Sequence, residues 1–427
     1  MPIPRHRRTS GLNGGRGLLS DELPLRPDLS IASERLQRLL IAKGGKQVEE
    51  ACRCIVANVI LAHWQGARIH YSRDNNFYAA SRAGAPSWFS RSAIACAVDQ
   101  LKARELIEEW RTDPSPCARY RSRLGATPKL LETIGLDNVY DLAWRDTPPV
   151  ILRCRADRRV LDPNAVLNEA ELAELGAIAR DVEAQNQFLS AFEVTLEQDV
   201  AEVLPTGFIK AAGVYLNPHA RSYYRVFNGD LRHGGRWYGP FWQNVPSSLR
   251  PKLLINREPT LELDFASCQL RLMYALVGLP DPLHSQIRTS DPTFDLYSIE
   301  GLDRDVVKLG VLIMANAGSV RSARKALAAK LISEPPENRL PEAARILTAV
   351  ESHFPELAPL WYSGVGLRLQ RADSDLCEQI QREMRAQGLP TLSVHDSFIS
   401  WRRAEQELRA AMQKAFVNTW DNISLGN

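Results

Sequence analysis

Two aspartates at the ends of apolar strands are the residues best placed for chemistry in this 427-residue sequence. Asp264 ends the alternating apolar run LELD, and the helical pattern FASCQLRLMYAL follows it. Asp396 lies at the predicted tip of a strand–turn–strand hairpin in LPTLSVHDSFISW. Carboxylates at strand ends can hold two Mg²⁺ ions about 3.5–4 Å apart, one activating an attacking oxygen and the other stabilising a leaving oxygen. Taken alone, each aspartate is more typical of a turn or a cap.

A predicted helix between the two aspartates, in GLDRDVVKLGVLIMANAGSVRSARKAL, has four residues of interest at intervals of four. Arg304, Lys308, Leu312 and Asn316 drift slowly around one face and span roughly 18 Å of helix axis. The two cations suit a triphosphate, the apolar side chain suits a stacked base, and the amide suits the templating end. A solvated Arg–Lys pair on an amphipathic helix has the same pattern. The spacing of this stripe of four residues therefore does not by itself identify a nucleotide site.

Together these segments resemble the motifs of the family A DNA polymerases and of their relatives, the single-subunit phage-type RNA polymerases. DFASCQLRLMYAL is similar to motif A, with Asp264, Leu270, Arg271 and Met273 in register. R-x3-K-x3-L-x3-N has the spacing of motif B, and SVHDSFI resembles motif C. Upstream, GGRWYGPFWQNVP is similar to the family's TGR element followed by its LQNIP element. The four motifs occur in the family's order.

The resemblance implies roles at the metal and nucleotide sites. Asp264 and Asp396 would ligate two Mg²⁺ ions, which Mn²⁺ could replace. Arg304 and Lys308 would bind the incoming triphosphate, and Lys308 would also donate a proton to the leaving pyrophosphate. Leu312 would cover the base.

The resemblance also implies a primer–template site. His395 would position the primer end beside the carboxylates. The remaining residues would contact the minor groove or the backbone of the duplex, and they are Arg236, Gln243, Asn244 and, by a looser match in LQRADSDL, Gln370.

Several positions depart from the family pattern. Gln269, a candidate nucleotide contact, stands where DNA polymerases usually have a glutamate against the sugar and the RNA polymerases have glycine, so the choice of ribose or deoxyribose is open. Asn316 and Ala317 replace the Tyr-Gly that closes motif B, which affects fidelity and translocation more than catalysis. Ser397 leaves one carboxylate in motif C, as in the RNA polymerases. Because no exonuclease carboxylate set is recognisable upstream, proofreading is not expected.

A second functional module is predicted in WFSRSAIACAVDQLKARELIEEWRTDPSPCARYRSRL. Ser90 can cap a helix that runs to about Ala103, and a strand, a turn and a basic strand follow. This order is typical of a winged helix, whose exposed helix face enters the major groove while the wing contacts phosphates. Arg119, Arg121 and Arg123 alternate and would share one face of the wing. The alternative is a small α+β domain whose arginines keep an edge strand soluble.

These interpretations lead to a predicted domain organisation. Residues 1–30 form a flexible basic tail, 31–130 a winged-helix-like nucleic-acid-binding domain, 131–205 a mostly helical, thumb-like connector, and 206–427 a polymerase palm and fingers. The expected fold class is α+β, with a right-hand palm built on an antiparallel sheet and with reduced helical fingers.

Composition restricts the function further. The chain is 44% apolar and 24% charged, and no apolar run approaches the roughly 20 residues that a bilayer span requires. A cytoplasmic protein without membrane contact is therefore expected. The net charge is only +3, so a polyanion must be bound by local clusters and not by a global field. The seven cysteines are scattered and are typical of reduced thiols.

The leading hypothesis is a template-directed nucleotidyltransferase that uses DNA template–primer and nucleoside triphosphates, of the kind found in mobile elements. A DNA polymerase is favoured over a primase or RNA polymerase of the same fold. The alternative from another class is a catalytically inactive DNA-binding replication or regulatory protein, which the shortened fingers favour. The presence of both aspartates together with Arg304 and Lys308 opposes that alternative. The sequence predicts no particular protein partner.

Overall fold

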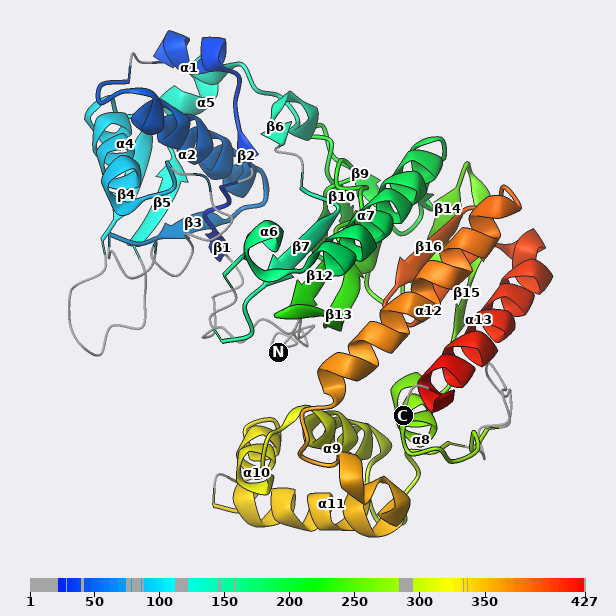
Figure 1. The fold of residues 1–427 in the computed structure, drawn as a ribbon. Helices are drawn as coiled ribbons and strands as arrows, with labels where there is room; N and C mark the ends of the chain where they lie inside the picture. The colour runs from blue at the N-terminus through cyan, green and yellow to red at the C-terminus, as the bar shows by residue number, and fades with distance from the viewer. Residues whose placement is uncertain are drawn as a thin grey trace. The chain divides into compact units, whose positions relative to one another are not determined.

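The computed structural model describes residues 22–27, 29–39, 42–73, 78, 86, 88–111, 122–144, 147–156, 159–283, 295–332, 334–335 and 337–425. Over these ranges the chain is a mixed α+β protein with mainly antiparallel sheets, as predicted at that level (Figure 1). It forms two compact units, one of residues 1–147 with 205–208 and the other of residues 148–204 with 209–427. This division differs from the boundaries at 130 and 205 that the sequence predicts.

The first unit contains a sheet with the strand order β1-β3-β5-β4, and α2 and α4 pack on each other and on its strands. The Ser90 hydroxyl accepts a hydrogen bond from the backbone N–H of Ala93, so the predicted cap of α4 is confirmed. The elements are β1 (Glu22–Pro24), β2 (Leu29–Ser30), α1 (Ser33–Leu39), α2 (Lys46–Trp64), β3 (Arg68–Tyr71), α4 (Arg91–Ala103), β4 (Ile107–Trp110), β5 (Ser122–Ala126), α5 (Pro128–Ile134), η1 (Val139–Asp141) and β6 (Ala143–Trp144).

The second unit is built around a sheet with the order β16-β17-β15-β14-β8, all of it antiparallel. A separate sheet has the order β13-β12-β7. The elements as far as β15 are β7 (Val150–Arg153), α6 (Pro163–Val166), α7 (Glu169–Ser190), β8 (Val194–Leu196), β9 (Glu202–Val203), β10 (Ile209–Ala211), β11 (Val214–Leu216), β12 (Tyr224–Asn228), β13 (Asp230–Tyr238), η2 (Phe241–Asn244), η3 (Arg250–Lys252), β14 (Leu253–Ile255) and β15 (Glu258–Asp264).

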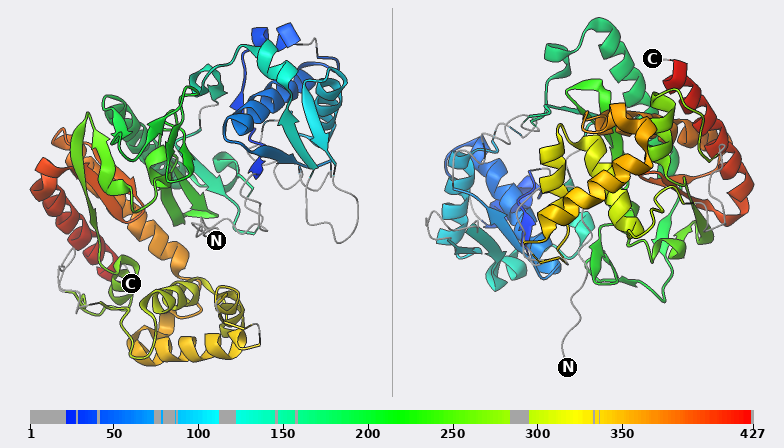
Figure 2. Two further views of the ribbon diagram at one scale, coloured as in Figure 1. Left: turned by 180° about the vertical axis from the view of Figure 1, so that it is seen from behind. Right: turned by 90° about the horizontal axis from the view of Figure 1, so that it is seen from below.

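The rest of the second unit is mostly helical. A long helix, α12, packs along β13 and against α13, while α9, α10 and α11 form a helical group next to its first turns (Figures 1 and 2). The elements are α8 (Cys268–Leu276), α9 (Arg304–Asn316), α10 (Val320–Ala328), α11 (Arg339–His353), η4 (Pro355–Leu360), α12 (Gly366–Ala386), β16 (Thr391–Val394), β17 (Ser397–Trp401), η5 (Arg402–Ala404) and α13 (Glu405–Leu425).

Burial explains why these segments adopt their structures. Every residue of β16 and β17 is buried, so both strands are continuous apolar or small-polar runs. In α12, Leu369, Leu376, Ile380 and Met384 are buried at helical spacing and form the face that packs on the sheets. The hairpin around Asp396 and the helix that begins at Arg304 are thus confirmed as elements.

Residues 131–205 are not the mostly helical segment that the sequence predicts. α7 is a long helix, but β7 pairs with β12 and β8 pairs with β14. These short strands are formed by pairing with distant parts of the chain, which a local pattern of charged and apolar residues does not reveal. No helix within the described ranges has both the length and the apolar composition for a membrane span.

Candidate active site

The two predicted metal ligands lie at the ends of neighbouring strands. Asp264 is the last residue of β15 and lies across from Ser397 of β17. Because Val394 pairs with Ser397, a two-residue turn of His395 and Asp396 joins β16 to β17. Paired Cα atoms of antiparallel strands are about 4.5–5.5 Å apart, and Asp396 directly precedes the partner of Asp264. The structure therefore brings both carboxylates to one edge of the sheet.

The turn that presents Asp396 has an unusual backbone. His395 has φ of 59°, in the left-handed region, which costs a residue with a side chain on the order of 1 kcal/mol. Desolvation and the nearby charges of Arg236 and Arg250 lower the pKa of His395, against the opposite effect of Asp396. The imidazole is therefore mainly neutral at neutral pH, so it can accept a hydrogen bond beside the carboxylates.

A third carboxylate, which the sequence analysis missed, lies close to this edge. Asp373, in the middle of α12, is only 3% exposed. Burial, together with the charges of Asp396 and Asp264, raises its pKa from the usual 3.8 to about 7, and Arg236 opposes this shift. The thiol of the buried Cys268 has a raised pKa, because of its burial and then the charges of Asp373 and Asp396. These mutual effects place the three carboxylates in one electrostatic cluster.

The two cations of the predicted stripe on α9, Arg304 and Lys308, lie near the ring of Tyr297. The guanidinium carbon of Arg304 is 5.7 Å from the centre of the Tyr297 ring, and the Lys308 ammonium is 6.0 Å from it. Burial and the charge of Asp396 raise the pKa of the Tyr297 hydroxyl. Tyr297 is therefore close to the cationic end of α9 and within electrostatic range of Asp396. Arg304 also forms an ion pair with Asp295.

The far end of the stripe abuts the start of α12. Leu312 is half-buried and Asn316 is exposed, while Val307, Val311 and Met314 on the opposite face are buried. The Asn316 amide donates a hydrogen bond of 2.8 Å to the backbone oxygen of Leu312. The four predicted residues thus share one accessible face of α9.

The predicted primer-binding residues differ in what they contact. The Nε of Arg236, on β13, lies 3.6 Å from a carboxylate oxygen of Asp373. The Gln243 amide donates to the backbone oxygens of Trp237 and Ser393, at 3.1 and 3.2 Å, so it holds η2 against β16. Asn244, next to it, is exposed. Arg236 is therefore at the carboxylate cluster, whereas the Gln243 amide nitrogen is engaged within the protein.

The remaining candidates have a weaker connection to the cluster. Gln269 is half-buried in the first turn of α8, five residues after Asp264, and Gln370 is half-buried near the start of α12. Arg123 lies on β5 of the first unit, opposite His70 and Trp110. Arg119 and Arg121 lie outside the described residues.

The cluster suits divalent cations. Mg²⁺ in phosphoryl-transfer sites is usually held by one or two carboxylates plus phosphate oxygens of the substrate, and not by a cage made only of protein. Among the described residues no group of three or more His, Cys, Asp or Glu side chains forms such a cage. Asp264 and Asp396 would supply the carboxylates. The pKa of Asp373 is raised first by burial and then by the charge of Asp396, so a cation bound here would oppose part of that shift.

A sequence signal for Asp373 exists in retrospect. It occurs at helical spacing with Leu369, Leu376 and Ile380 on the buried face of α12, where a carboxylate is out of place unless it is paired or functional. Tyr297 has no comparable local signal.

In comparisons with known proteins, no protein-family model matches the chain and no curated protein matches it in sequence.

Proposed function

We propose that the protein is a template-directed nucleotidyltransferase that extends a nucleic-acid strand by attack of a 3′-hydroxyl on the α-phosphate of a nucleoside triphosphate. One observation carries the proposal: Asp264 and Asp396 meet at one sheet edge, and the Arg304–Lys308 pair is linked to that edge through Tyr297. Anionic ligands for metal and cationic ligands for phosphate are thereby arranged around one site, as phosphoryl transfer requires.

The chain's own residues have distinct tasks in this reaction. Asp264 and Asp396 would hold two Mg²⁺ ions, which when bound lower the pKa of the attacking hydroxyl and neutralise charge on the leaving group. Arg304 and Lys308 bind and orient the triphosphate, and Lys308 provides the proton for the pyrophosphate. Leu312 stacks against the base.

His395 and Arg236 would bind the end of the primer. His395, mainly neutral, accepts a hydrogen bond from the primer terminus, and Arg236 donates to acceptors of the primer strand. Gln269 lies in the turn of α8 that follows Asp264, where it would meet the sugar of the nucleotide. We favour deoxynucleotides and a DNA polymerase, with primase or RNA polymerase activity of the same site as the alternative.

The first unit would deliver the enzyme to DNA as a winged helix. The order α2, β3, α4, β4, β5, with β5 between β3 and β4, supports this assignment. The exposed face of α4 contains Arg91, Ser92 and Lys102 but also Asp99, which pairs with Arg73 at 2.6 Å. Because this face has charges of both signs, it is better suited to hydrogen bonds with base edges than to purely electrostatic binding of phosphates.

Primer extension on a defined template tests the proposal. The wild-type protein should incorporate nucleotides with Mg²⁺ or Mn²⁺, and assays with dNTPs or NTPs, with and without primer, identify the polymer. Asp264→Asn and Asp396→Asn should each lower incorporation by at least about 100-fold, since loss of a metal ligand exceeds the effect of an outer-shell partner. Asp421→Asn, an exposed carboxylate on α13, is the matched control and should retain wild-type activity.

Two results would contradict the proposal. Incorporation that survives both aspartate substitutions would place the chemistry elsewhere. A wild-type protein that binds primer–template but incorporates nothing under any combination of metal and nucleotide would favour the inactive replication or regulatory protein.

A further inference from the structure

The Asp373 carboxylate is buried, and few polar contacts offset the cost of burying its charge. Its residue is 3% exposed, and one carboxylate oxygen lies 3.6 Å from the Nε of Arg236. The other oxygen is buried and accepts no hydrogen bond from the described part of the chain. Because a buried carboxylate is costly unless it is paired and hydrogen-bonded, the protein tolerates this arrangement at the expense of stability. Such a cost is typical of a group that has a function.

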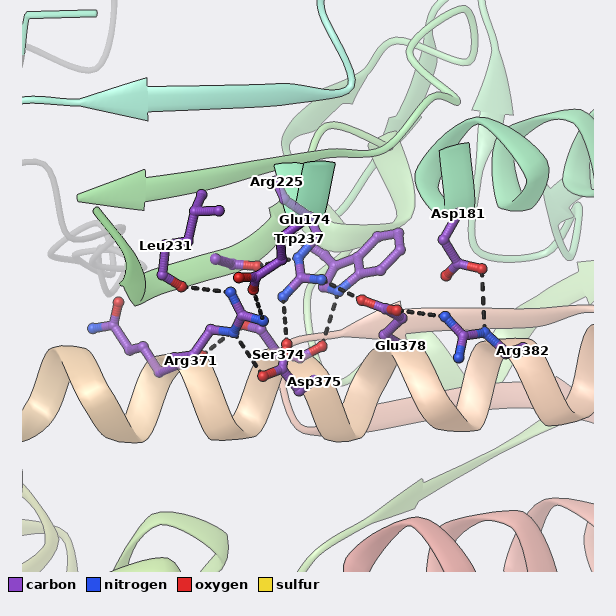
Figure 3. A network of polar contacts seen from close by, with 12 residues as sticks. Glu174, Asp181, Arg225, Leu231, Trp237, Arg371, Ser374, Asp375, Glu378 and Arg382 are labelled. Carbon is purple, nitrogen blue, oxygen red and sulfur yellow. Dashed lines mark hydrogen bonds and ion pairs between the residues drawn. The ribbon is translucent and has the colours of Figure 1, made fainter. Parts of the chain in front are cut away.

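The position of Asp373 relative to Arg236 is determined by the neighbouring residues on both elements. Trp237, next to Arg236 on β13, donates from its indole N–H to the backbone oxygen of Ser374, next to Asp373 on α12, at 3.2 Å (Figure 3). This buried hydrogen bond sets the register of the helix along the strand. It therefore brings the segment that contains Asp373 next to the segment that contains Arg236.

The other face of α12 is fixed by a separate network. Asp375, two residues after Asp373, pairs with the fully buried Arg225 of β12 at 2.9 Å and with Arg371 at 2.6 Å (Figure 3). Glu378 also pairs with Arg225. The network attaches this face of α12 to β12. The two aspartates of RADSD thus have different surroundings on one helix.

We propose that Asp373 is a positioning residue that holds the Arg236 guanidinium beside the catalytic carboxylates, so that Arg236 binds the primer strand in a fixed orientation. The inference rests on the proposed function. The contact of Asp373 with Arg236 is through Nε, at 3.6 Å, and the terminal nitrogens would donate to an acceptor on the primer. A guanidinium fixed at one edge loses less conformational entropy when it binds at the other.

The chemistry of the ligand follows from the donor. Arg236 offers N–H groups only, so it recognises acceptors: phosphate oxygens or the minor-groove base atoms of the primer strand. Its location beside Asp264 and Asp396 restricts recognition to the terminal base pairs, where the 3′-hydroxyl must be aligned. A primer–template with a recessed 3′ end is therefore the ligand that the pair favours over single-stranded DNA.

Binding of a fluorescent recessed primer–template to the full-length protein, measured by anisotropy without nucleotide, tests the inference. Arg236→Ala and Asp373→Asn should each weaken binding about tenfold, and the double variant should be within about twofold of the weaker single variant, because the residues act as one unit. Asp373→Glu should recover part of the affinity. In steady state, Asp373→Asn should raise KM for primer–template more than it lowers kcat.

Asp375→Asn is the matched control, since it makes the same chemical change on the other face of α12. It should lower the unfolding temperature and leave primer–template affinity within about twofold of wild type, because it removes a structural ion pair only. This control separates positioning of Arg236 from general loosening of the helix.

The possible failures are distinguishable. Wild-type affinity in Asp373→Asn, or additive losses in the double variant, would overturn the inference even if the enzyme incorporates nucleotides. A wild-type protein that incorporates nothing but shows the coupled loss of binding would overturn the catalytic proposal and support the positioning role. A wild-type protein without affinity for primer–template would overturn both.

Discussion

At the scale of single residues, the raised pKa of Asp373 makes a prediction about stability. A carboxyl whose pKa is higher in the folded than in the unfolded protein binds more protons when folded, so it stabilises the fold at low pH. This stabilisation is lost as the pH rises from 3.8 to about 7. The cause is burial next to Asp264 and Asp396, opposed by Arg236. Asp373→Asn cannot ionise, so its free energy of unfolding should increase relative to wild type over that interval.

Denaturant titrations of both proteins at several pH values, without divalent cations, measure this difference. The other ionisable groups contribute similarly to both proteins and cancel in the comparison. A difference in free energy of unfolding that stays constant between pH 4 and pH 7 would show that Asp373 does not titrate in the expected environment.

The residues also show what a sequence can reveal locally. Asp264 and Asp396 were recognisable because a strand end and a two-residue turn are local features. Asp373 fits the spacing of the buried face of α12, but its meeting with Arg236, 137 positions earlier in the chain, depends on packing that the sequence does not reveal. Tyr297 depends in the same way on a contact between α9 and the segment before it.

At the scale of elements, α9 and α12 meet closely at a glycine. A Cβ atom on Gly366 would lie 2.2 Å from the side-chain oxygen of Asn316. Gly366→Ala should therefore displace the Asn316 amide from its bond to Leu312 and destabilise the protein by about 1–2 kcal/mol, despite the better helix propensity of alanine. Thermal unfolding measures the loss.

A second substitution provides the control for that junction. Asn316→Ala removes the clashing amide, so the double variant should regain the stability lost in Gly366→Ala. If the double variant is as unstable as Gly366→Ala alone, the close contact with Asn316 is not the reason for the glycine.

The attachment of α12 to β12 makes a second prediction at this scale. Arg225 is fully buried and its Nε donates to the backbone oxygen of Gly235 at 2.7 Å, while its terminal nitrogens meet Asp375 and Glu378 (Figure 3). Arg225→Ala leaves these groups without their shared cation and should cost about 3–5 kcal/mol in the free energy of unfolding. Chemical denaturation measures it.

The matched control is Arg409→Ala on α13, where Arg409 forms an exposed pair with Glu405 four residues away. Exposed pairs of this spacing contribute about 0.3–0.5 kcal/mol. Equal losses from the two substitutions would mean that the buried network does not fix α12.

At the scale of the whole molecule, the division into two units was only partly predictable. The predicted boundary at residue 205 lies next to a boundary between the units, but residues 131–147 and 205–208 belong to the first unit. The backbone N–H of Val139 donates to the oxygen of Thr206, at 2.8 Å, and Phe208 is buried. A chain that leaves a unit and returns to it for four residues gives no periodic or compositional signal.

The charge of the molecule sets the last prediction. With a net charge of +3, attraction to DNA must come from local groups, and the predicted basic strand of the first unit is the candidate. Replacing Arg119, Arg121 and Arg123 with alanine should weaken DNA binding and reduce the slope of log K against log salt by about 0.9 for each lost phosphate contact. Fluorescence anisotropy over a range of salt concentrations measures the slope.

A variant with the same loss of charge on other elements isolates the effect of position. Arg38, Lys43 and Lys46 are exposed on α1 and around the start of α2, and their replacement by alanine also removes three positive charges. If the arginines contact phosphates, only their removal changes the salt slope substantially, because counterions are released at contacts and not by net charge. Equal changes of slope in both triple variants would mean that the first unit attracts DNA by its overall charge, and the wing would then have no special part in binding.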